Sequence, residues 1–280
     1  MKIDEENYYI DSTRESSDKI FLRRLFRGER PRKKVLFFIH EVATHSGIFD
    51  SFFNEIIKNE KSIEVFCMDI YGHGRSGGER LGSCSIQDYQ NDIKNALEKI
   101  VELSNLPVLM AGIGFGAGLI LNFLSEVEDE TIKGVVLLNP MLEVDLGFNR
   151  LEKILFSDFN QGSSLRVPSK ITPSMMVDKE SSQISLGKDP LCFNFFTRGL
   201  LRQMRLVSKN ARQKAYFVDQ PSFIILSDRS RMYNNDIVPI FSKGLRSKKI
   251  KIESIEGSHL FPVEEKKFVK DFVSWLNENC

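Results

Sequence analysis

The stretch LPVLMAGIGFGAGLILNFL, residues 106–124, decides the fold of this chain. It opens as an apolar run of strand type, reaches a glycine-rich turn at 112–118, and continues as an apolar run long enough for a helix. A strand that passes through a tight glycine turn directly into a helix is typical of α/β proteins. In such proteins these turns carry ligand-binding or catalytic groups.

Two motifs of different chemistry fit this turn. Gly112, Gly114 and Ala117 match G-x-G-x-x-G/A, the loop that holds the pyrophosphate of a dinucleotide. Gly112, Gly114 and Gly116 match G-x-S-x-G, the turn that carries a hydrolase nucleophile, with a glycine in place of the serine. A dinucleotide loop normally lies in the first βαβ unit and is followed, about 20 residues later, by an acid. Here the next strand ends in Leu138-Asn139-Pro140, without an acid. We therefore favour the hydrolase turn and keep dinucleotide binding as a weaker hypothesis.

The segments around this turn alternate between strands and helices. Strands are predicted at 19–28, as an edge strand, and at 35–40, 63–70, 106–112, 132–140, 220–226 and 248–255. Helices are predicted at 47–58, 85–103, 119–127 and the C-terminal FVKDFVSWLNEN. This alternation indicates a mainly parallel sheet covered on both faces. Residues 142–218 show no clear strand and predict a helical insertion between the core segments 1–141 and 219–280.

Composition and charge describe an ordinary globular protein. The 280 residues are 41% hydrophobic and 28% charged, and the net charge of +1 gives no general attraction to nucleic acid or membranes. The four cysteines show no paired spacing, so we expect neither a metal site nor a disulfide framework. The acidic start of the chain and the lack of an apolar run of about 20 residues predict a cytoplasmic protein.

All four histidines follow predicted strands. They are His40, His45, His73 and His259. Ligands bind at the carboxyl ends of the strands in open α/β sheets, so this placement favours a functional site over scattered surface histidines.

These features resemble the α/β-hydrolases of the monoacylglycerol lipase and lysophospholipase type, which are similar to serine aminopeptidases of the S33 kind. The family's H-G-x-x-E-H-S-G-R-Y loop has its counterpart in HEVATHSGIF at 40–49, and its D-x-x-G-H-G-x-S-x-G signature is intact at 69–78. Asp189-Pro190-Leu191 matches a triplet that commonly follows the first half of the family's cap. The resemblance implies an α/β-hydrolase fold, with a mostly parallel central sheet, helices on both faces and residues 142–218 as a helical cap.

The resemblance also assigns a position to each part of a serine hydrolase site. These positions are Gly114 for the nucleophile, His259 for the base, Ser230 or the nearby Asp228 for the acid, and the N–H groups of Val42 and Phe115 for the oxyanion hole, with His40 and Glu41 beside them.

Three of these positions depart from hydrolase chemistry. Gly114 has no hydroxyl with which to form an acyl-enzyme, and Ser230 has no carboxylate. Glu41 replaces a family glycine and brings a carboxylate beside a site that should stabilise negative charge. Proteins of the N-myc downstream-regulated type, regarded as non-catalytic, carry a similar G-x-G-x-G-A-G turn. We therefore predict a pseudo-hydrolase. The alternative is a hydrolase in which His259, with Asp228 or Glu41, activates water directly.

The predicted pseudo-hydrolase binds an acyl- or lipid-like small molecule in its former acyl pocket, or a protein partner through the cap. We expect no cofactor and no nucleic acid, and at most peripheral contact with a membrane. Gly114 would enlarge the floor of the pocket. The residues expected to line it are Phe115, Phe193, Phe195 and Phe196.

Two charged or amphipathic segments remain. RLEKILFSDF at 150–159 favours an inner helix of the cap over a membrane anchor. The basic residues from Arg23 to Lys34 favour a solvated hairpin tip, with contact to anionic lipid headgroups as the alternative.

Overall fold

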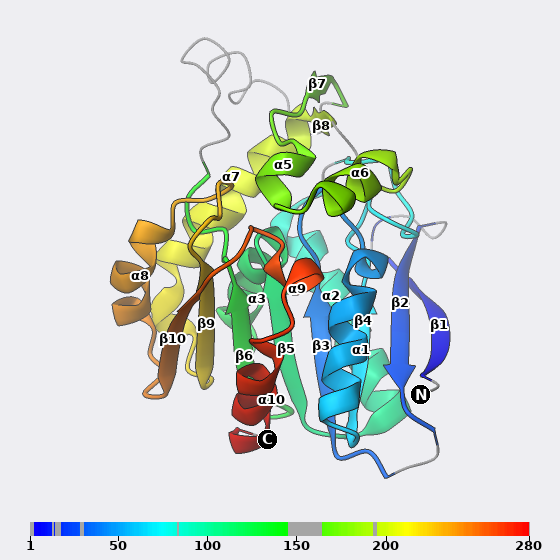
Figure 1. Ribbon diagram of the computed structural model, residues 1–280, viewed down its shortest axis with the longest axis vertical. Helices are drawn as coiled ribbons and strands as arrows, with labels where there is room; N and C mark the ends of the chain where they lie inside the picture. The colour runs from blue at the N-terminus through cyan, green and yellow to red at the C-terminus, as the bar shows by residue number, and fades with distance from the viewer. Residues whose placement is uncertain are drawn as a thin grey trace.

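An eight-stranded sheet forms the centre of the molecule (Figure 1). The computed structural model describes residues 3–12, 14, 18–28, 31–82, 84–144, 164–192 and 195–279. The strand order is β1-β2-β4-β3-β5-β6-β9-β10. The strands are β1 (Asp4–Asp11), β2 (Lys19–Phe26), β3 (Lys34–Ile39), β4 (Ile63–Met68), β5 (Val108–Ile113), β6 (Ile132–Leu138), β9 (Ser222–Ser227) and β10 (Ile250–Ile255).

The six strands from β4 to β10 in this order run parallel, whereas β1 and β2 are antiparallel to their neighbours. Every residue of β3, β4 and β5 is buried, as expected for continuous apolar runs covered on both faces. The prediction that 19–28 forms the edge strand is wrong, because β1 pairs with β2 along its whole length and takes the edge. The polar sequence of β1 gave no sign of a buried strand, and its burial alternates between half-buried and exposed residues.

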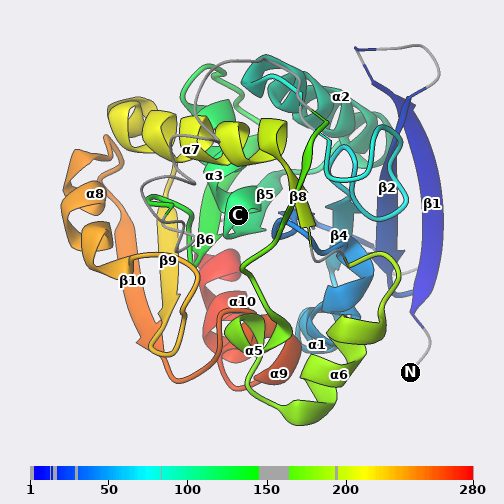
Figure 2. The same cartoon turned by 90° about the horizontal axis from the view of Figure 1, so that it is seen from above.

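Helices cover both faces of the sheet (Figure 2). One face carries α1 (Asp50–Asn59) and α10 (Val269–Glu278), which pack against each other. The other face carries α2 (Ile86–Ser104), α3 (Phe115–Leu124) and α7 (Arg198–Gln213), with α3 packed against both of its neighbours. The helices of the core are α1 (Asp50–Asn59), α2 (Ile86–Ser104), α3 (Phe115–Leu124), α8 (Val238–Gly244), α9 (Phe261–Glu264) and α10 (Val269–Glu278), with short 3-10 turns η1 (Ser46–Phe49), η2 (Ala215–Phe217) and η3 (Asn235–Ile237).

The chain reverses its direction of travel across the sheet at β3. From β3 it moves outward to β4 and then returns to the other side of β3 to form β5. Loops after two such strands diverge and leave a crevice at their carboxyl ends, which is where ligands bind in open α/β sheets. Glu41 follows β3 and Gly114 follows β5, so the topology places both residues at this crevice.

Part of the insertion between β6 and β9, with α5 and α6, covers the carboxyl ends of the strands, whereas its last helix packs on one face of the sheet (Figure 1). Its described part contains α5 (Pro173–Met176), α6 (Glu180–Lys188) and α7 (Arg198–Gln213), with β7 (Arg166–Pro168) paired to β8 (Phe195–Thr197). The prediction that this segment holds no strand is therefore wrong. The amphipathic stretch 150–159 lies outside the described residues. Among the described helices, none is both long enough and apolar enough to cross a membrane.

The basic run after residue 22 is only partly a solvated tip. Arg23 and Arg24 lie within β2 and are each 8% exposed. Arg23 donates to Glu5 and Asp50, and Arg24 donates to Glu6 and to the fully buried Glu64. These two arginines are therefore internal ion-pair partners and are not available to lipid headgroups.

Candidate active site

The turn between β5 and α3 has the tight geometry that the sequence predicts. Gly114 lies between strand and helix with φ 53° and ψ −111°, in the region that favours glycine. A Cβ atom on Gly112 would lie 2.7 Å from the Ala117 nitrogen, and one on Gly116 would overlap the carbonyl oxygen of Ile39. The small residues therefore let the turn pass close to the loop after β3.

The side chain of Glu41 points into the site from that loop. Its Oε1 atom accepts hydrogen bonds from the backbone N–H of Val42, at 2.7 Å, and of Phe115, at 2.9 Å. These are the two N–H groups predicted to form the oxyanion hole. Tyr233 adds a third donor, with its hydroxyl 3.0 Å from the same oxygen. The predicted oxyanion hole is therefore filled by a carboxylate of the protein itself.

The second oxygen of Glu41 lies where a side chain at position 114 would lie. A Cβ atom built on Gly114 would overlap Oε2, so a side chain at 114 and the present position of Glu41 exclude each other. Oε2 also lies 2.6 Å from Nε2 of His259. The prediction that Gly114 enlarges an open pocket is wrong, because the Glu41 carboxylate fills the space.

The other side of the His259 ring faces Ser230. The Ser230 hydroxyl lies 2.9 Å from Nδ1. The Ser230 hydroxyl and the Glu41 carboxylate therefore give both ring nitrogens of His259 a hydrogen-bond partner. A serine hydroxyl carries no charge, so it offers an imidazolium less stabilisation than the aspartate of a catalytic triad does.

Asp228 does not join this network. Its carboxylate accepts from the N–H of Gly257 at 3.0 Å, and its side chain is otherwise exposed. The hypothesis that Asp228 pairs with His259 is therefore not supported, and the neighbour at Nδ1 is Ser230. Asp228 instead links the loop after β9 to the loop that carries His259.

His40 and His73 are buried and form hydrogen bonds within the loops after β3 and β4. His40 lies 2.8 Å through Nδ1 from the Glu41 carbonyl oxygen, and its Nε2 accepts from the N–H of Ile70 at 2.9 Å. Complete burial lowers the pKa of His40. Burial also lowers the pKa of His73, to about 3, and the nearby His40 contributes in the same direction. Both imidazole rings are therefore neutral at pH 7, and both histidines have a structural role.

A cap residue seals the site. The N–H of Leu260, next to His259, donates to the carbonyl oxygen of Met176 in α5 at 2.7 Å. Glu41 and His259 are both 0% exposed. Phe115 is also buried and packs edge-on against Tyr89, with ring centroids 5.6 Å apart. The fold therefore encloses the site completely.

The aromatic residues expected to line a pocket have different surroundings. Phe196 is fully buried in the short cap sheet, and the ring of Phe195 lies under the guanidinium of Arg166 at 4.6 Å. Phe193 lies outside the described residues.

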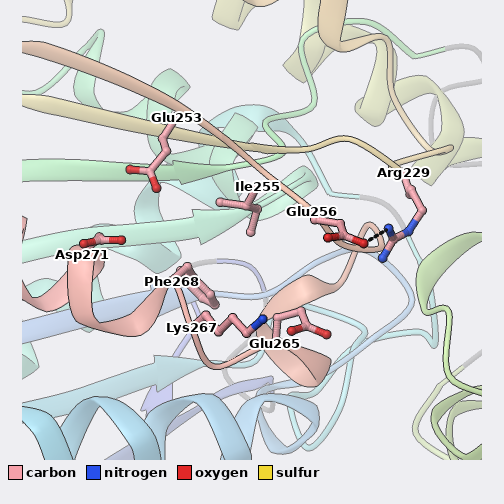
Figure 3. A pocket seen from close by; sticks show the side chains of 8 residues that line it. All are labelled: Arg229, Glu253, Ile255, Glu256, Glu265, Lys267, Phe268 and Asp271. Carbon is pink, nitrogen blue, oxygen red and sulfur yellow. Dashed lines mark hydrogen bonds and ion pairs between the residues drawn. The ribbon is translucent and has the colours of Figure 1, made fainter.

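A pocket of about 430 Å³ with many charged residues lies beside the loop that carries His259 (Figure 3). Its lining residues are Arg229, Glu253, Ile255, Glu256, Glu265, Lys267, Phe268 and Asp271. Arg229 pairs with Glu256 at 3.0 Å and with Asp178 of the cap at 2.8 Å. The pocket holds none of the residues of the Glu41–His259 network, and its arginine fastens the cap to the core.

One group of side chains has the donor types of a metal site. His45, Asp189 and Cys192 bring their ligand atoms within 4.8 Å of one another. However, Nδ1 of His45 accepts from the N–H of Gly47, so the ring proton is on Nε2, which donates to Asp189 at 3.1 Å. Metal-bound histidines have the opposite arrangement, with the non-ligating nitrogen as a donor. This group is better described as a link between core and cap.

The position of Glu41 disfavours a dinucleotide at the glycine turn between β5 and α3. A pyrophosphate is held by free N–H groups at a helix N-terminus. Here the first N–H group of α3, on Phe115, already donates to the carboxylate of Glu41. A second anion at this position would be repelled.

Tyr233 is the site residue that the sequence did not reveal. It lies between β9 and η3, 192 positions from Glu41, and its ring stands edge-on to His259 with centroids 5.2 Å apart. Burial and the Glu41 carboxylate raise its pKa well above the usual value, so its hydroxyl remains a donor. No motif surrounds it in the sequence.

Comparison with known proteins agrees with this architecture. Residues 30–265 match the family model described as serine aminopeptidase, S33. A monoglyceride lipase homolog of monkeypox virus is 28% identical over 120 residues, a match that spans 40% of each chain. A soluble variant of monoglyceride lipase from Saccharomyces cerevisiae superimposes with a TM-score of 0.82 at 17% identity, covering 98% of this chain and 95% of that one.

A second solved structure, the monoacylglycerol lipase of Paleococcus ferrophilus, gives a TM-score of 0.75 at 17% identity and covers all of both chains. At these identities the superpositions establish the fold alone. The family match extends over most of the chain, from the strand before Glu41 to beyond His259. The protein therefore belongs to the serine aminopeptidase S33 family and has the α/β-hydrolase fold that its monoglyceride lipase relatives share.

Proposed function

We propose that this protein is a pseudo-hydrolase: it does not hydrolyse carboxylic esters and uses the hydrolase fold to bind a ligand or a partner. One observation carries the proposal. A single carboxylate, that of Glu41, occupies both the oxyanion hole and the space of the nucleophile side chain.

Two physical effects act together against ester hydrolysis. Loss of the serine nucleophile alone lowers turnover by a factor on the order of 10⁶ in serine hydrolases. In addition, a tetrahedral intermediate needs hydrogen-bond donors for its developing negative charge. In this chain both backbone donors already bind a carboxylate, and that carboxylate would repel an oxyanion placed beside it.

The test is labelling of the purified chain with a fluorophosphonate probe, together with turnover of p-nitrophenyl esters and monoacylglycerols. We expect neither labelling nor turnover above the heat-denatured chain. The matched variant combines Gly114→Ser with Glu41→Gly, which supplies a hydroxyl beside His259 and frees both N–H groups. We expect this variant to be labelled. Labelling of the unaltered chain would overturn the proposal.

One contact favours a second function, in which His259 activates a water molecule directly. Nε2 of His259 lies 2.6 Å from Oε2 of Glu41, so a proton can pass between the two groups. This mechanism requires Glu41 to leave the oxyanion hole and admit both water and ester. It predicts ester cleavage without labelling, abolished by His259→Ala. Cleavage that persists in His259→Ala would exclude it.

The binding partners belong to the proposal as well. A small molecule beneath the cap, or a protein at the cap surface, is the expected partner, in a cytoplasmic setting with at most peripheral membrane contact. Support comes from the contacts of His259 with Ser230 and Glu41, which occupy both ring nitrogens of the predicted base. A site whose groups pair with one another favours binding over catalysis.

A further inference from the structure

We propose that two copies of this chain associate through the free edge of β10 and form one continuous sheet across a two-fold axis. β10 is the last strand in the order of the eight-stranded sheet, and among the described strands it pairs with β9 alone. An unpaired strand edge presents N–H and C=O groups that can pair with another strand. The proposal concerns this edge and does not depend on the proposed function.

The pairing of β10 with β9 shows which of its backbone groups face the open edge. The carbonyl oxygens of Lys249 and Ile255 accept from the N–H groups of Ser222 and Asp228, at 2.8 and 3.0 Å. The N–H and C=O groups of successive residues in a strand point in alternate directions, so the odd-numbered residues of β10 face β9. The even-numbered residues point these groups to the open edge. They are Ile250, Ile252 and Ser254.

These edge-facing groups fit an antiparallel copy of the same strand. With the two-fold axis at Ile252, this residue lies opposite its own copy, and Ile250 lies opposite Ser254 of the second copy. In both pairs two edge-facing residues meet, so each pair exchanges two N–H···O=C bonds. Lys251 then lies opposite Glu253 of the second copy. This intervening pair has no backbone bonds, and side chains come closest together in such pairs.

The charges of β10 favour this register over its neighbours. Lys251 and Glu253 point to the same face of the sheet and form an ion pair, with Nζ 3.1 Å from Oε2. With the axis at Ile252, each of these charges meets an opposite charge of the second copy. An axis at residue 251 would place Lys251 against itself, and an axis at residue 253 would place Glu253 against itself. Opposite charges directly across a ladder stabilise it, and like charges destabilise it.

The charged pocket beside β10 also fits a lysine of a second copy (Figure 3). Four of its eight lining residues are acidic and two are basic. Glu253 and Asp271 belong to the acidic group, on the face of the sheet that carries α10. In the proposed register, Lys251 of the second copy meets Glu253 at this pocket and adds a cation where acids predominate.

Apolar surface lies on the opposite face of the same strand. Ile252 is 44% exposed, and its side chain points away from the face of Lys251 and Glu253 because side chains alternate along a strand. Both views place α8 at this end of the molecule, and α8 carries Ile240, which is 73% exposed (Figure 1, Figure 2). Specific interfaces bury roughly 1,200–2,000 Å² in total, so contact between the two α8 helices should extend the strand pairing.

The experiment measures the molar mass of the full chain by light scattering after size-exclusion chromatography, over a wide range of concentrations. We expect twice the 32.2 kDa of one chain at the higher concentrations. Lys251→Glu sets two acids against each other and should raise the dissociation constant about tenfold or more. Glu253→Lys should do the same, and the two changes together should restore the dimer. The matched control is Lys94→Glu, at an exposed position of α2 far from β10, which should change nothing.

Ile252→Pro tests the backbone pairing separately. Its N–H group points to the open edge, where proline is tolerated, so we expect a folded chain by circular dichroism that stays monomeric. If this variant does not fold, the charge variants decide.

Three outcomes would overturn the proposal. An unaltered chain that is monomeric at all concentrations would leave the β10 edge to an extended segment of another protein. A dimer that survives both Lys251→Glu and Ile252→Pro would use another surface. Failure of the combined charge exchange to restore the dimer would contradict the proposed register.

Discussion

Replacing Glu41 should destabilise the protein, although removal of a buried charge often has the opposite effect. In Glu41→Ala, four buried donors lose their acceptor: the N–H groups of Val42 and Phe115, the hydroxyl of Tyr233, and the Nε2–H group of His259. A buried donor without a partner costs about 1–3 kcal/mol. The vacated space suits one water molecule, which satisfies about three groups. We therefore expect a loss of about 2–4 kcal/mol in the free energy of unfolding.

Glu41→Gln separates the role of charge from that of shape. The amide oxygen can accept from the same three donors, and the amide nitrogen then faces His259. That contact requires His259 to change tautomer, which Ser230 permits because its hydroxyl can accept from Nδ1–H as well as donate. Charge-assisted hydrogen bonds are lost, but so is the cost of burying a charge. We expect Glu41→Gln to lie within about 1 kcal/mol of the unaltered chain.

Urea unfolding at pH 7, followed by circular dichroism, measures these differences, and equal slopes against urea confirm that the compared states are similar. Glu98→Ala is the control, since Glu98 is exposed on α2 and should change stability by less than about 0.5 kcal/mol. A Glu41→Ala protein as stable as the unaltered chain would refute the reasoning, because Glu41 could not then be the acceptor for four buried donors.

Three further changes test other parts of the site. Gly114→Ser should lower the free energy of unfolding by about 3 kcal/mol, because its Cβ overlaps the Glu41 carboxylate. In a double-mutant cycle measured by urea unfolding, adding Glu41→Gly should recover part of that loss. Purely additive effects would contradict the overlap. The pKa of His73 is lowered in the folded state, to about 3, so the unfolded chain protonates first as the pH falls below 6.5. Stability should therefore decrease by about 3 kcal/mol from pH 6.5 to pH 4 on account of this group, and His73→Gln should remove that part of the pH dependence in urea titrations. Asn139→Ala should cost about 3 kcal/mol in the same assay, since its buried amide donates to the His259 carbonyl at 2.9 Å and also pairs with Ser227 at the end of β9. A cost below about 1 kcal/mol would show that this amide does not hold the His259 loop to the sheet.

Local sequence was sufficient for most of the fold and for the positions of the site. The buried strands are continuous apolar runs and α2 has one apolar face, and such patterns depend only on neighbouring residues. The glycines around residue 114 likewise predict the tight turn. Three strands could not be predicted in this way. β1 is polar and owes its place to pairing with β2, and β7 and β8 are three-residue strands that pair across the cap. Pairing between distant segments leaves little trace in either segment.

Arg23 and Arg24 show the same limit for charge. In sequence they belong to a basic run, which normally indicates a solvated surface. In the structure their partners come from β1, β4 and the start of α1, and the arginines are buried. Sequence reports the sign of a charge, but only the fold brings the opposite charge to it.

The absence of a serine at position 114 and the presence of a carboxylate at position 41 are facts of the sequence alone. That the Glu41 carboxylate lies where a side chain at position 114 would lie is a fact of the tertiary structure. The Glu41 side chain can point outward or inward from the same loop, and its direction depends on donors far away in the chain, namely Phe115, Tyr233 and His259. A buried carboxylate is stable only where such donors converge, and their convergence is produced by the packing of the whole sheet and its loops.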